Sequence, residues 1–120
     1  MLEIHESEMH MLLVSVQPGE EVMESVSRQL EELGVTNGAI AALIGAVDAC
    51  AISNMAKDDH RNDILTELKQ PLEFSGTGEI KAGAVHVHCT VSGEGNTALG
   101  GHLHWARVEN FFVNAYVLPS

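Results

Sequence analysis

Basic residues are scarce in this sequence. Six lysines and arginines stand against 17 aspartates and glutamates in 120 residues, which gives a formal net charge of −11 with histidine neutral. A surface of this sign repels a phosphate backbone, and no cluster of basic residues could line a groove for nucleic acid. Charge therefore argues against direct, sequence-independent DNA binding by this chain alone. The scattered basic residues are Arg28, Lys57, Arg61, Lys69, Lys81 and Arg107.

Cysteines and long apolar runs are also few. Cys50 and Cys89 form neither a CxxC motif nor a disulfide framework, so we expect buried, reduced thiols in a cytoplasmic protein. No apolar run reaches the roughly 20 residues of a membrane span, and we expect no membrane partner. The acidic residues 1–6 lack the apolar stretch of a secretory signal. Together with the length, these features predict a single globular domain over residues 1–120.

The apolar pattern predicts one main helix packed on a mostly antiparallel sheet. Apolar side chains recur at helical spacing over residues 19–33, and Gly34 follows at the position where helices stop. Residues 54–62 are polar and charged, which predicts a solvated loop. The total is about seven strands and an α+β fold. The strands are expected at residues 9–16, 39–53 (two strands, or one bent at Gly45), 63–70, 72–80 and 108–118, and on both sides of a glycine-rich turn near Gly95.

Two His-x-His pairs flank that glycine-rich turn. Side chains two apart on a strand point to the same face, so His86 points with His88, and His102 points with His104. If the two strands form a hairpin that closes near Gly95, His88 lies opposite His102 and His86 lies opposite His104. Directly opposed residues in an antiparallel pair have Cβ atoms about 4.5–5.5 Å apart. Up to four imidazoles would then converge on one patch.

Imidazole chemistry makes this patch a candidate metal site. Neutral imidazole is the commonest metal ligand, and three histidines with one coordination position free describe a catalytic or ligand-binding zinc site. The alternative is a set of ordinary polar residues on a solvated face. The Gly100-Gly101 pair predicts a bulge, which makes the position of His104 less secure than the others. Glu73 and Glu79 are candidates to orient a histidine ligand, or are simply exposed.

Several segments together resemble the plants and prokaryotes conserved (PPC) domain. The resemblance covers nearly the whole chain, from about Leu12 to Leu118, and its most specific part is His-x-His followed by Gly-Gly-His-Leu. It implies an α+β fold, a homotrimer and, in prokaryotic members, a zinc held by three histidines. The segments that carry it are Pro18-Gly19-Glu20-Glu21, Leu33-Gly34-Val35, the strand around Gly45, Leu72-Glu73-Phe74-Ser75-Gly76-Thr77-Gly78, Val85-His86-Val87-His88 and Gly100-Gly101-His102-Leu103.

Carried over position by position, the resemblance implies zinc ligands at His86, His88 and His102. His104 departs from the family pattern, which usually has an apolar residue there. It could be a fourth ligand, a group that orients a ligand, or a spectator. In plants this domain accompanies AT-hook motifs, and the family is generally labelled DNA-binding. This chain contains no Arg-Gly-Arg-Pro-like hook, which is the part that would read a minor groove.

Three functions fit these observations. The first is a PPC-domain trimer with a regulatory or nucleoid-associated role, acting through protein partners or a small ligand, with indirect DNA contact at most. The second is a zinc-dependent enzyme or sensor for a carboxylate or ketoacid. Zinc with a free position can polarise a carbonyl or lower the pKa of bound water to about 7, and Glu73, Glu79 and His104 are the candidate acids or bases. The third is a metal-stabilised structural trimer. No nucleophile motif or phosphate loop indicates a particular reaction.

Overall fold

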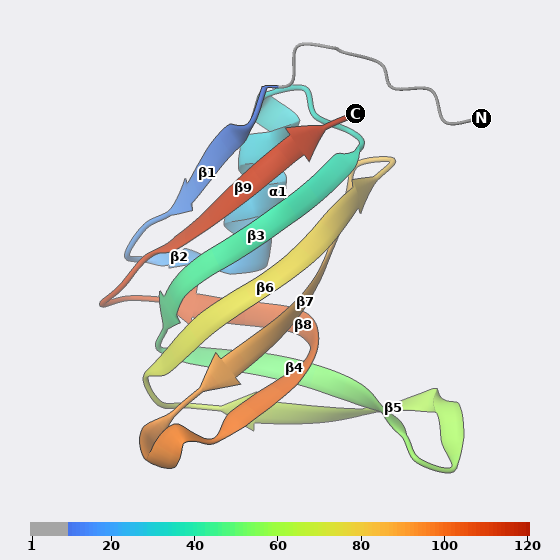
Figure 1. Ribbon diagram of the computed structural model, residues 1–120, viewed down its shortest axis with the longest axis vertical. Coiled ribbons are helices and arrows are strands. Elements are labelled where there is room, and N and C mark those ends of the chain that lie inside the picture. Colours follow the sequence, from blue (N-terminus) through green and yellow to red (C-terminus); the bar gives the residue numbers. More distant parts are fainter. Residues whose placement is uncertain (1–9) are drawn as a thin grey trace, which may run out of the picture.

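The computed structural model of the protein describes residues 10–120. Over that range the chain forms one nine-stranded sheet, one α-helix and a short 3-10 turn at Glu94–Asn96 (Figure 1). Along the sheet the strands run in the order β1-β9-β3-β6-β7-β8-β4-β5, with β2 paired to β8, and every pair is antiparallel. The elements are β1 (Leu12–Val16), β2 (Glu20–Glu21), α1 (Val22–Glu32), β3 (Gly38–Val47), β4 (Ala49–Ala56), β5 (Asp59–Leu68), β6 (Leu72–Lys81), β7 (Ala84–Ser92), β8 (Ala98–Val108) and β9 (Val113–Pro119).

Helix α1 begins at a carboxylate cap and ends at a glycine. The side chain of Glu21 accepts hydrogen bonds of 2.8 Å from the backbone N–H groups of Met23 and Glu24, which have no partner inside the helix. After the last turn, Gly34 has a φ of +74°, the left-handed conformation that commonly closes a helix. The predicted helix and its stop are confirmed, although the helix starts later than expected because β2 occupies the preceding residues. With 11 residues, this one α-helix of the described chain is too short to cross a membrane.

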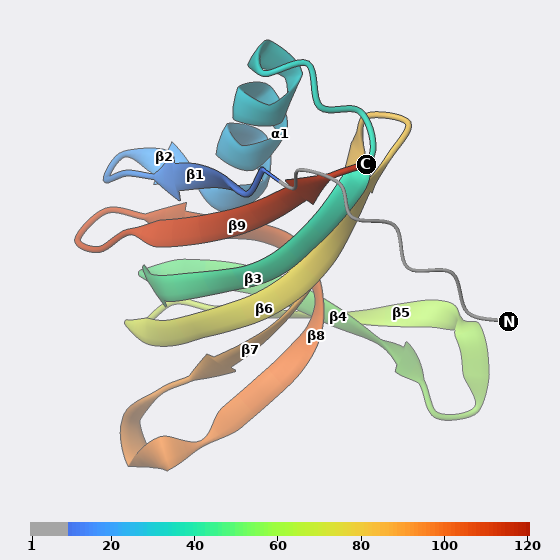
Figure 2. The same ribbon diagram turned by 45° about the horizontal axis from the view of Figure 1, so that its top comes forward.

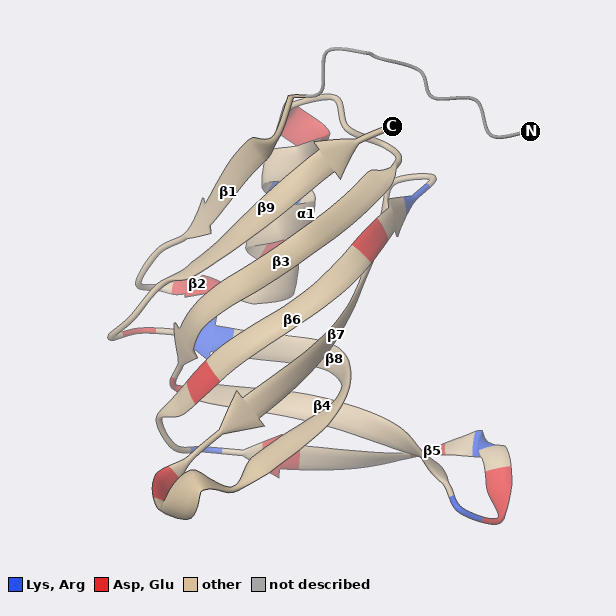
Figure 3. Ribbon diagram, in the orientation of Figure 1, with Lys and Arg blue, Asp and Glu red and all other residues tan. Residues whose placement is uncertain are grey.

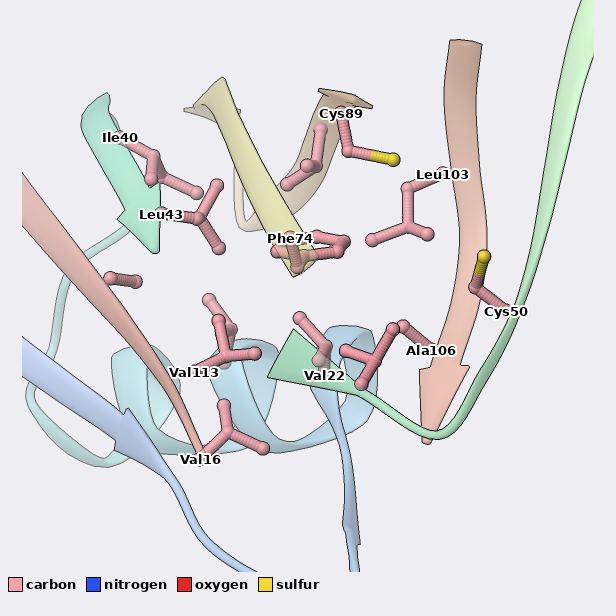
Figure 4. Packing of buried hydrophobic residues seen from close by; sticks show 14 of the residues in the cluster. Val16, Val22, Ile40, Leu43, Cys50, Phe74, Cys89, Leu103, Ala106 and Val113 are labelled. Atoms are coloured by element: carbon pink, nitrogen blue, oxygen red, sulfur yellow. The ribbon is translucent and has the colours of Figure 1, made fainter. Parts of the chain in front are cut away.

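The core lies between α1 and one face of the sheet (Figure 2). Phe74 is 2% exposed and lies at the centre of the packing, between Leu43 of β3 and Leu103 of β8 (Figure 4). Along most strands buried residues alternate with more exposed ones, so most buried positions fall on the face that meets the helix. Strand β4 is an exception, because its residues 49–53 are all buried. The opposite face of the sheet is therefore free to present polar side chains. Fully buried members of the core include Val14, Val16, Val22, Val26, Val47, Val87, Val91 and Val113.

The structure corrects the predicted strands in three places. The sheet has nine strands instead of about seven, partly because the two-residue β2 is too short to show a periodicity. The predicted loop at 54–62 is wrong, since β4 and β5 continue through it as a hairpin. Its residues are mostly exposed on both faces, so they show no apolar alternation. The last strand starts at Val113 instead of 108, because Asp48 holds a turn by accepting backbone hydrogen bonds from Glu109 and Asn110.

The hairpin of β4 and β5 projects from the body of the domain (Figures 1 and 2). We refer to residues 54–66 as the arm. Every residue of β5 except Leu68 is exposed, and the arm carries apolar side chains, including Met55 at 66% and Leu65 at 53% exposure. A two-stranded hairpin is marginally stable in water by itself. A further contact would therefore stabilise the arm.

Candidate metal centre

Three histidines from two neighbouring strands converge on the exposed face of the sheet. His86 and His88 lie on β7, and His102 of β8 pairs directly with His88. One nitrogen from each imidazole lies within 4.8 Å of the others. The ring of His86 is the middle one, with its centroid 4.8 Å from that of His88 and 4.7 Å from that of His102. The predicted pairing of His88 with His102 is confirmed, and the three residues implied as ligands lie together.

Two glycines of β6 allow the histidine strand to approach closely. A Cβ atom on Gly78 would lie 2.3 Å from the carbonyl oxygen of His86, and one on Gly76 would lie 2.5 Å from that of His88. Both distances are far below a van der Waals contact between carbon and oxygen. A side chain at either position would therefore push β7 away from β6. The glycines fix the backbone from which two of the three imidazoles project.

A bulge at His104 interrupts the pairing of β8 with β4. In the pairing of β8 with β4, Leu103 lies opposite Ile52 and Trp105 lies opposite Ala51, so His104 has no opposite residue. It is the extra residue of a β-bulge, which redirects a side chain and increases the local twist. The bulge expected on this strand is present, but it falls at His104 and not at the paired glycines.

His104 reaches a different partner from the one predicted. The pairing of β7 with β8 ends at His88 and His102, so the expected pair of His86 and His104 does not form. The Nε2 atom of His104 instead lies 2.7 Å from the hydroxyl oxygen of Ser53 on β4, in a hydrogen bond. Its ring centroid is 4.8 Å from that of His102. His104 thus belongs to the histidine patch but not to the group of three whose nitrogens converge.

The surroundings of His102 lower its pKa. Burial lowers the pKa of His102, the charges of His86, His104 and His88 lower it further, and Asp63 raises it. Its Nδ1 atom is buried and has no hydrogen-bond partner. An unsatisfied buried nitrogen is costly, and neutral imidazole is the form that coordinates a metal. A neutral imidazole with a buried, unpartnered nitrogen, lying among three other imidazoles, is the feature that a bound cation would explain.

The donor set fits zinc. Three neutral imidazoles satisfy three positions of a tetrahedral zinc and leave the fourth free. Zinc–nitrogen bonds of about 2.0–2.1 Å place neighbouring ligand nitrogens about 3.3 Å apart. The nitrogens of this cluster, which lie within 4.8 Å of one another, would need to approach by up to about 1.5 Å to match that spacing. Changes of side-chain rotamer at the exposed residues His86 and His88 can supply that movement.

The two candidate glutamates lie in different places. Glu79 is paired directly with His86, and together with Thr77 and two histidines it lines a shallow cavity of about 220 Å³. Glu73 is paired with Ser92, four residues along β6 from Thr77, which corresponds to roughly 13 Å at 3.3 Å per residue. Glu79 therefore stays a candidate to orient a histidine ligand, whereas Glu73 lies outside the cluster.

Two residues near the site were missed from the sequence. Ser53 pairs with His102 across β4 and β8, and Asp63 on β5 is close enough to raise the pKa of that imidazole. Asp63 fell at the start of the strand predicted over 63–70, directly after the predicted loop, and Ser53 fell at the end of an apolar stretch. No local motif marks Ser53 or Asp63. Their place beside the histidines depends on the pairing of β4 with β8, two strands that lie far apart in the sequence.

The fold and the site define an α+β protein whose antiparallel sheet presents a candidate metal centre on its exposed face. The family model of the Plants and Prokaryotes Conserved (PCC) domain, the PPC domain above, matches residues 4–119. The chain belongs to this family, and the resemblance seen in the sequence is confirmed. No curated protein matches the chain in sequence.

Solved structures share the fold over most of the chain. A metal-containing protein from Archaeoglobus fulgidus is 26% identical, with a TM-score of 0.75 over 98% of this chain and 85% of that one. A protein from Ralstonia eutropha whose name proposes DNA binding is 18% identical, with a TM-score of 0.77 over 90% and 76% of the two chains. A plant- and prokaryote-conserved protein from Pyrococcus horikoshii is 19% identical, with a TM-score of 0.70 over 98% and 86%.

Proposed function

We propose that this chain is a homotrimeric zinc-binding PPC-domain protein with a regulatory role, exerted through a protein partner or a small ligand. The zinc ligands are His86, His88 and His102. The observation that carries the proposal is their convergence on one face, with the buried Nδ1 atom of His102 lacking a partner. The 26% identical protein from Archaeoglobus fulgidus, which contains a metal, supports it. Bound zinc with a free position would supply Lewis-acid chemistry or a place for an anionic ligand.

Metal content tests this proposal. We expect elemental analysis of the purified protein to give close to one zinc per chain, and His88→Ala to lose most of it, because two imidazoles bind zinc much more weakly than three. His60→Ala is the matched control, since His60 is exposed on β5 and is not part of the cluster. Equal zinc in the wild type and in His88→Ala would contradict the proposed ligand set.

We infer from the charge that any DNA contact is made through a partner. Figure 3 shows acidic and basic residues spread over the fold, with no basic stripe. Arg28 is held by Glu20 at 2.9 Å, with further acidic neighbours on the helix, and Arg61 is held by Asp59 at 3.2 Å. Within residues 10–120, Arg28 and Arg61 are thus already engaged in ion pairs. We expect no shift of a DNA fragment by the purified protein at physiological salt; a retarded band under those conditions would contradict this part of the proposal.

Exposed apolar side chains at two separate places support self-association. Ile44 of β3 is 57% exposed on the sheet face opposite the helix, and the arm exposes Met55 and Leu65. Different patches on one chain can meet between copies in a head-to-tail contact, and such contacts close into rings when the rotation allows. A second copy of this chain seated against the arm would stabilise a hairpin that has little support of its own. This geometry is the basis on which we propose the trimer.

The histidine patch also supports a second function. The shallow cavity beside it is lined by Thr77, Glu79 and two histidines, and a three-histidine zinc would face it with one free position. A small carboxylate or ketoacid anion could bind there, which would make the protein a sensor or a zinc-dependent enzyme. Titration of acetate and pyruvate into the zinc-loaded protein by calorimetry tests this function. Binding that disappears in His88→Ala supports it, and the absence of binding in the loaded protein contradicts it.

The free thiols support a cytoplasmic location for the protein. Cys50 and Cys89 are both free and buried. Buried, unpaired cysteines are typical of proteins kept in a reducing compartment.

A further inference from the structure

The fourth histidine is the part of the patch that the proposed zinc site does not use. We propose that Ser53 holds His104 outside the coordination sphere and thereby keeps the fourth position of the metal free for an outside ligand. This inference rests on the proposed zinc site at His86, His88 and His102, and it assigns to two further residues the control of access to that metal.

His104 is close enough to be a ligand. Its ring centroid lies 4.8 Å from that of His102, which equals the separation of His86 and His88, two members of the converging group. A fourth imidazole would complete a tetrahedral zinc, and fully protein-ligated zinc sites are structural. An unrestrained His104 would therefore close the site against a small ligand. Something must hold it away if the metal is to bind one.

Ser53 supplies that restraint. Its hydroxyl lies 2.7 Å from the Nε2 atom of His104, and the residue is only 3% exposed. Water cannot readily replace His104 as the partner of so buried a hydroxyl, so release of the imidazole would leave a polar group unsatisfied. The burial also argues against Ser53 as a nucleophile, because a substrate could not reach its oxygen. The hydrogen bond occupies Nε2, one of the two nitrogens that could bind the metal.

The backbone favours the same arrangement. His104 is the bulged residue of β8, with no residue opposite it on β4. A bulge increases the local twist of a strand, and here His104 bonds to Ser53 while it still lies beside His102, outside the converging group. Strand geometry and the hydrogen bond thus act together to keep the fourth imidazole beside the metal but off it.

Azide binding to the cobalt-loaded protein tests the inference. Co²⁺ substitutes for zinc with similar ligands and has a visible absorption spectrum that responds to added ligands. We expect azide to change the spectrum of the wild type. In Ser53→Ala the freed His104 should take the fourth position, weaken azide binding by about tenfold or more, and shift the absorption bands as a fourth nitrogen binds. His104→Gln and the double variant Ser53→Ala/His104→Gln, which lack the fourth imidazole, should bind azide as the wild type does.

The four proteins separate the possible failures. If the wild type takes up no cobalt, the proposed zinc site itself is wrong. If all four load with cobalt and Ser53→Ala binds azide as tightly as the wild type, the role of Ser53 is overturned while the zinc site stands. The role of Ser53 is also overturned if the double variant binds azide as weakly as Ser53→Ala does. The loss of azide affinity would then not come from His104. Circular dichroism melting curves check that each variant is folded.

Discussion

At the scale of single residues, His102 is the least exposed imidazole of the patch. Its Nδ1 atom is buried without a partner, and burial together with the neighbouring histidines lowers its pKa. The protein therefore keeps this side chain neutral and ready to coordinate, at some cost to the metal-free fold. The metal-free protein should therefore be less stable than the metal-bound protein.

The lowered pKa predicts how the metal-free protein responds to acid. Below the ordinary histidine value of 6.5, the unfolded chain binds a proton at His102 that the folded chain does not bind, so stability falls as the pH falls. We expect His102→Gln, which cannot titrate, to reduce the drop in melting temperature of the chelator-treated protein between about pH 7 and about pH 5. Burial and then the neighbours His86, His104 and His88 lower this pKa, and Asp63 opposes them. Equal drops in melting temperature in the wild type and in His102→Gln would contradict this prediction.

The cysteines give a second prediction at this scale. Burial and the nearby Cys50 raise the pKa of the Cys89 thiol to about 12, and burial raises that of Cys50. Because the thiolate is the reactive form, we expect neither thiol of the native protein to react with Ellman's reagent at the rate of an exposed cysteine. Both should react after unfolding in guanidinium. Fast reaction of the native protein would show that the site around these thiols is more open than the packing in Figure 4.

At the scale of elements, β6 sets the position of the histidine strand. Gly78 leaves room for the carbonyl oxygen of His86, which a Cβ atom would approach to 2.3 Å. We expect Gly78→Val to reduce the free energy of unfolding by about 1–3 kcal/mol, the usual range for overpacking, and to lower zinc content as β7 shifts. Ser75→Val is the matched control, since it adds the same side chain at an exposed position of the same strand. Chemical denaturation and elemental analysis measure both effects, and equal outcomes for the two variants would contradict this role.

Features formed by elements that are close in the sequence could be predicted, and those formed by distant strands could not. The pair of His88 and His102 is local, because a short glycine-rich turn joins β7 to β8 and the His-x-His spacing specifies the shared face. The helix was predictable from its periodicity and from Gly34. The contact of Ser53 with His104 was not, since β4 reaches β8 from far along the chain and a bulge shifts the alternation between them. The exposed arm lacks the apolar alternation by which strands are recognised.

At the scale of the whole molecule, the exposed apolar side chains predict assembly. We expect the protein to be a trimer by light scattering, and Ile44→Glu to shift it toward the monomer, because a buried unpaired charge at an interface is costly. Leu33→Glu is the matched control. Leu33 is 55% exposed at the end of α1, on the helix side of the sheet. A wild type that runs as a monomer, or an unchanged mass for Ile44→Glu, would contradict the proposed surface.

Zinc location is the measurement that tests the central claim most directly. Crystals of the protein purified with zinc in the medium should show, at the zinc absorption edge, one strong anomalous peak per chain. The account predicts that this peak lies between the imidazoles of His86, His88 and His102, with His104 still bonded to Ser53. No peak at the patch, or a peak bound by other residues, would contradict it.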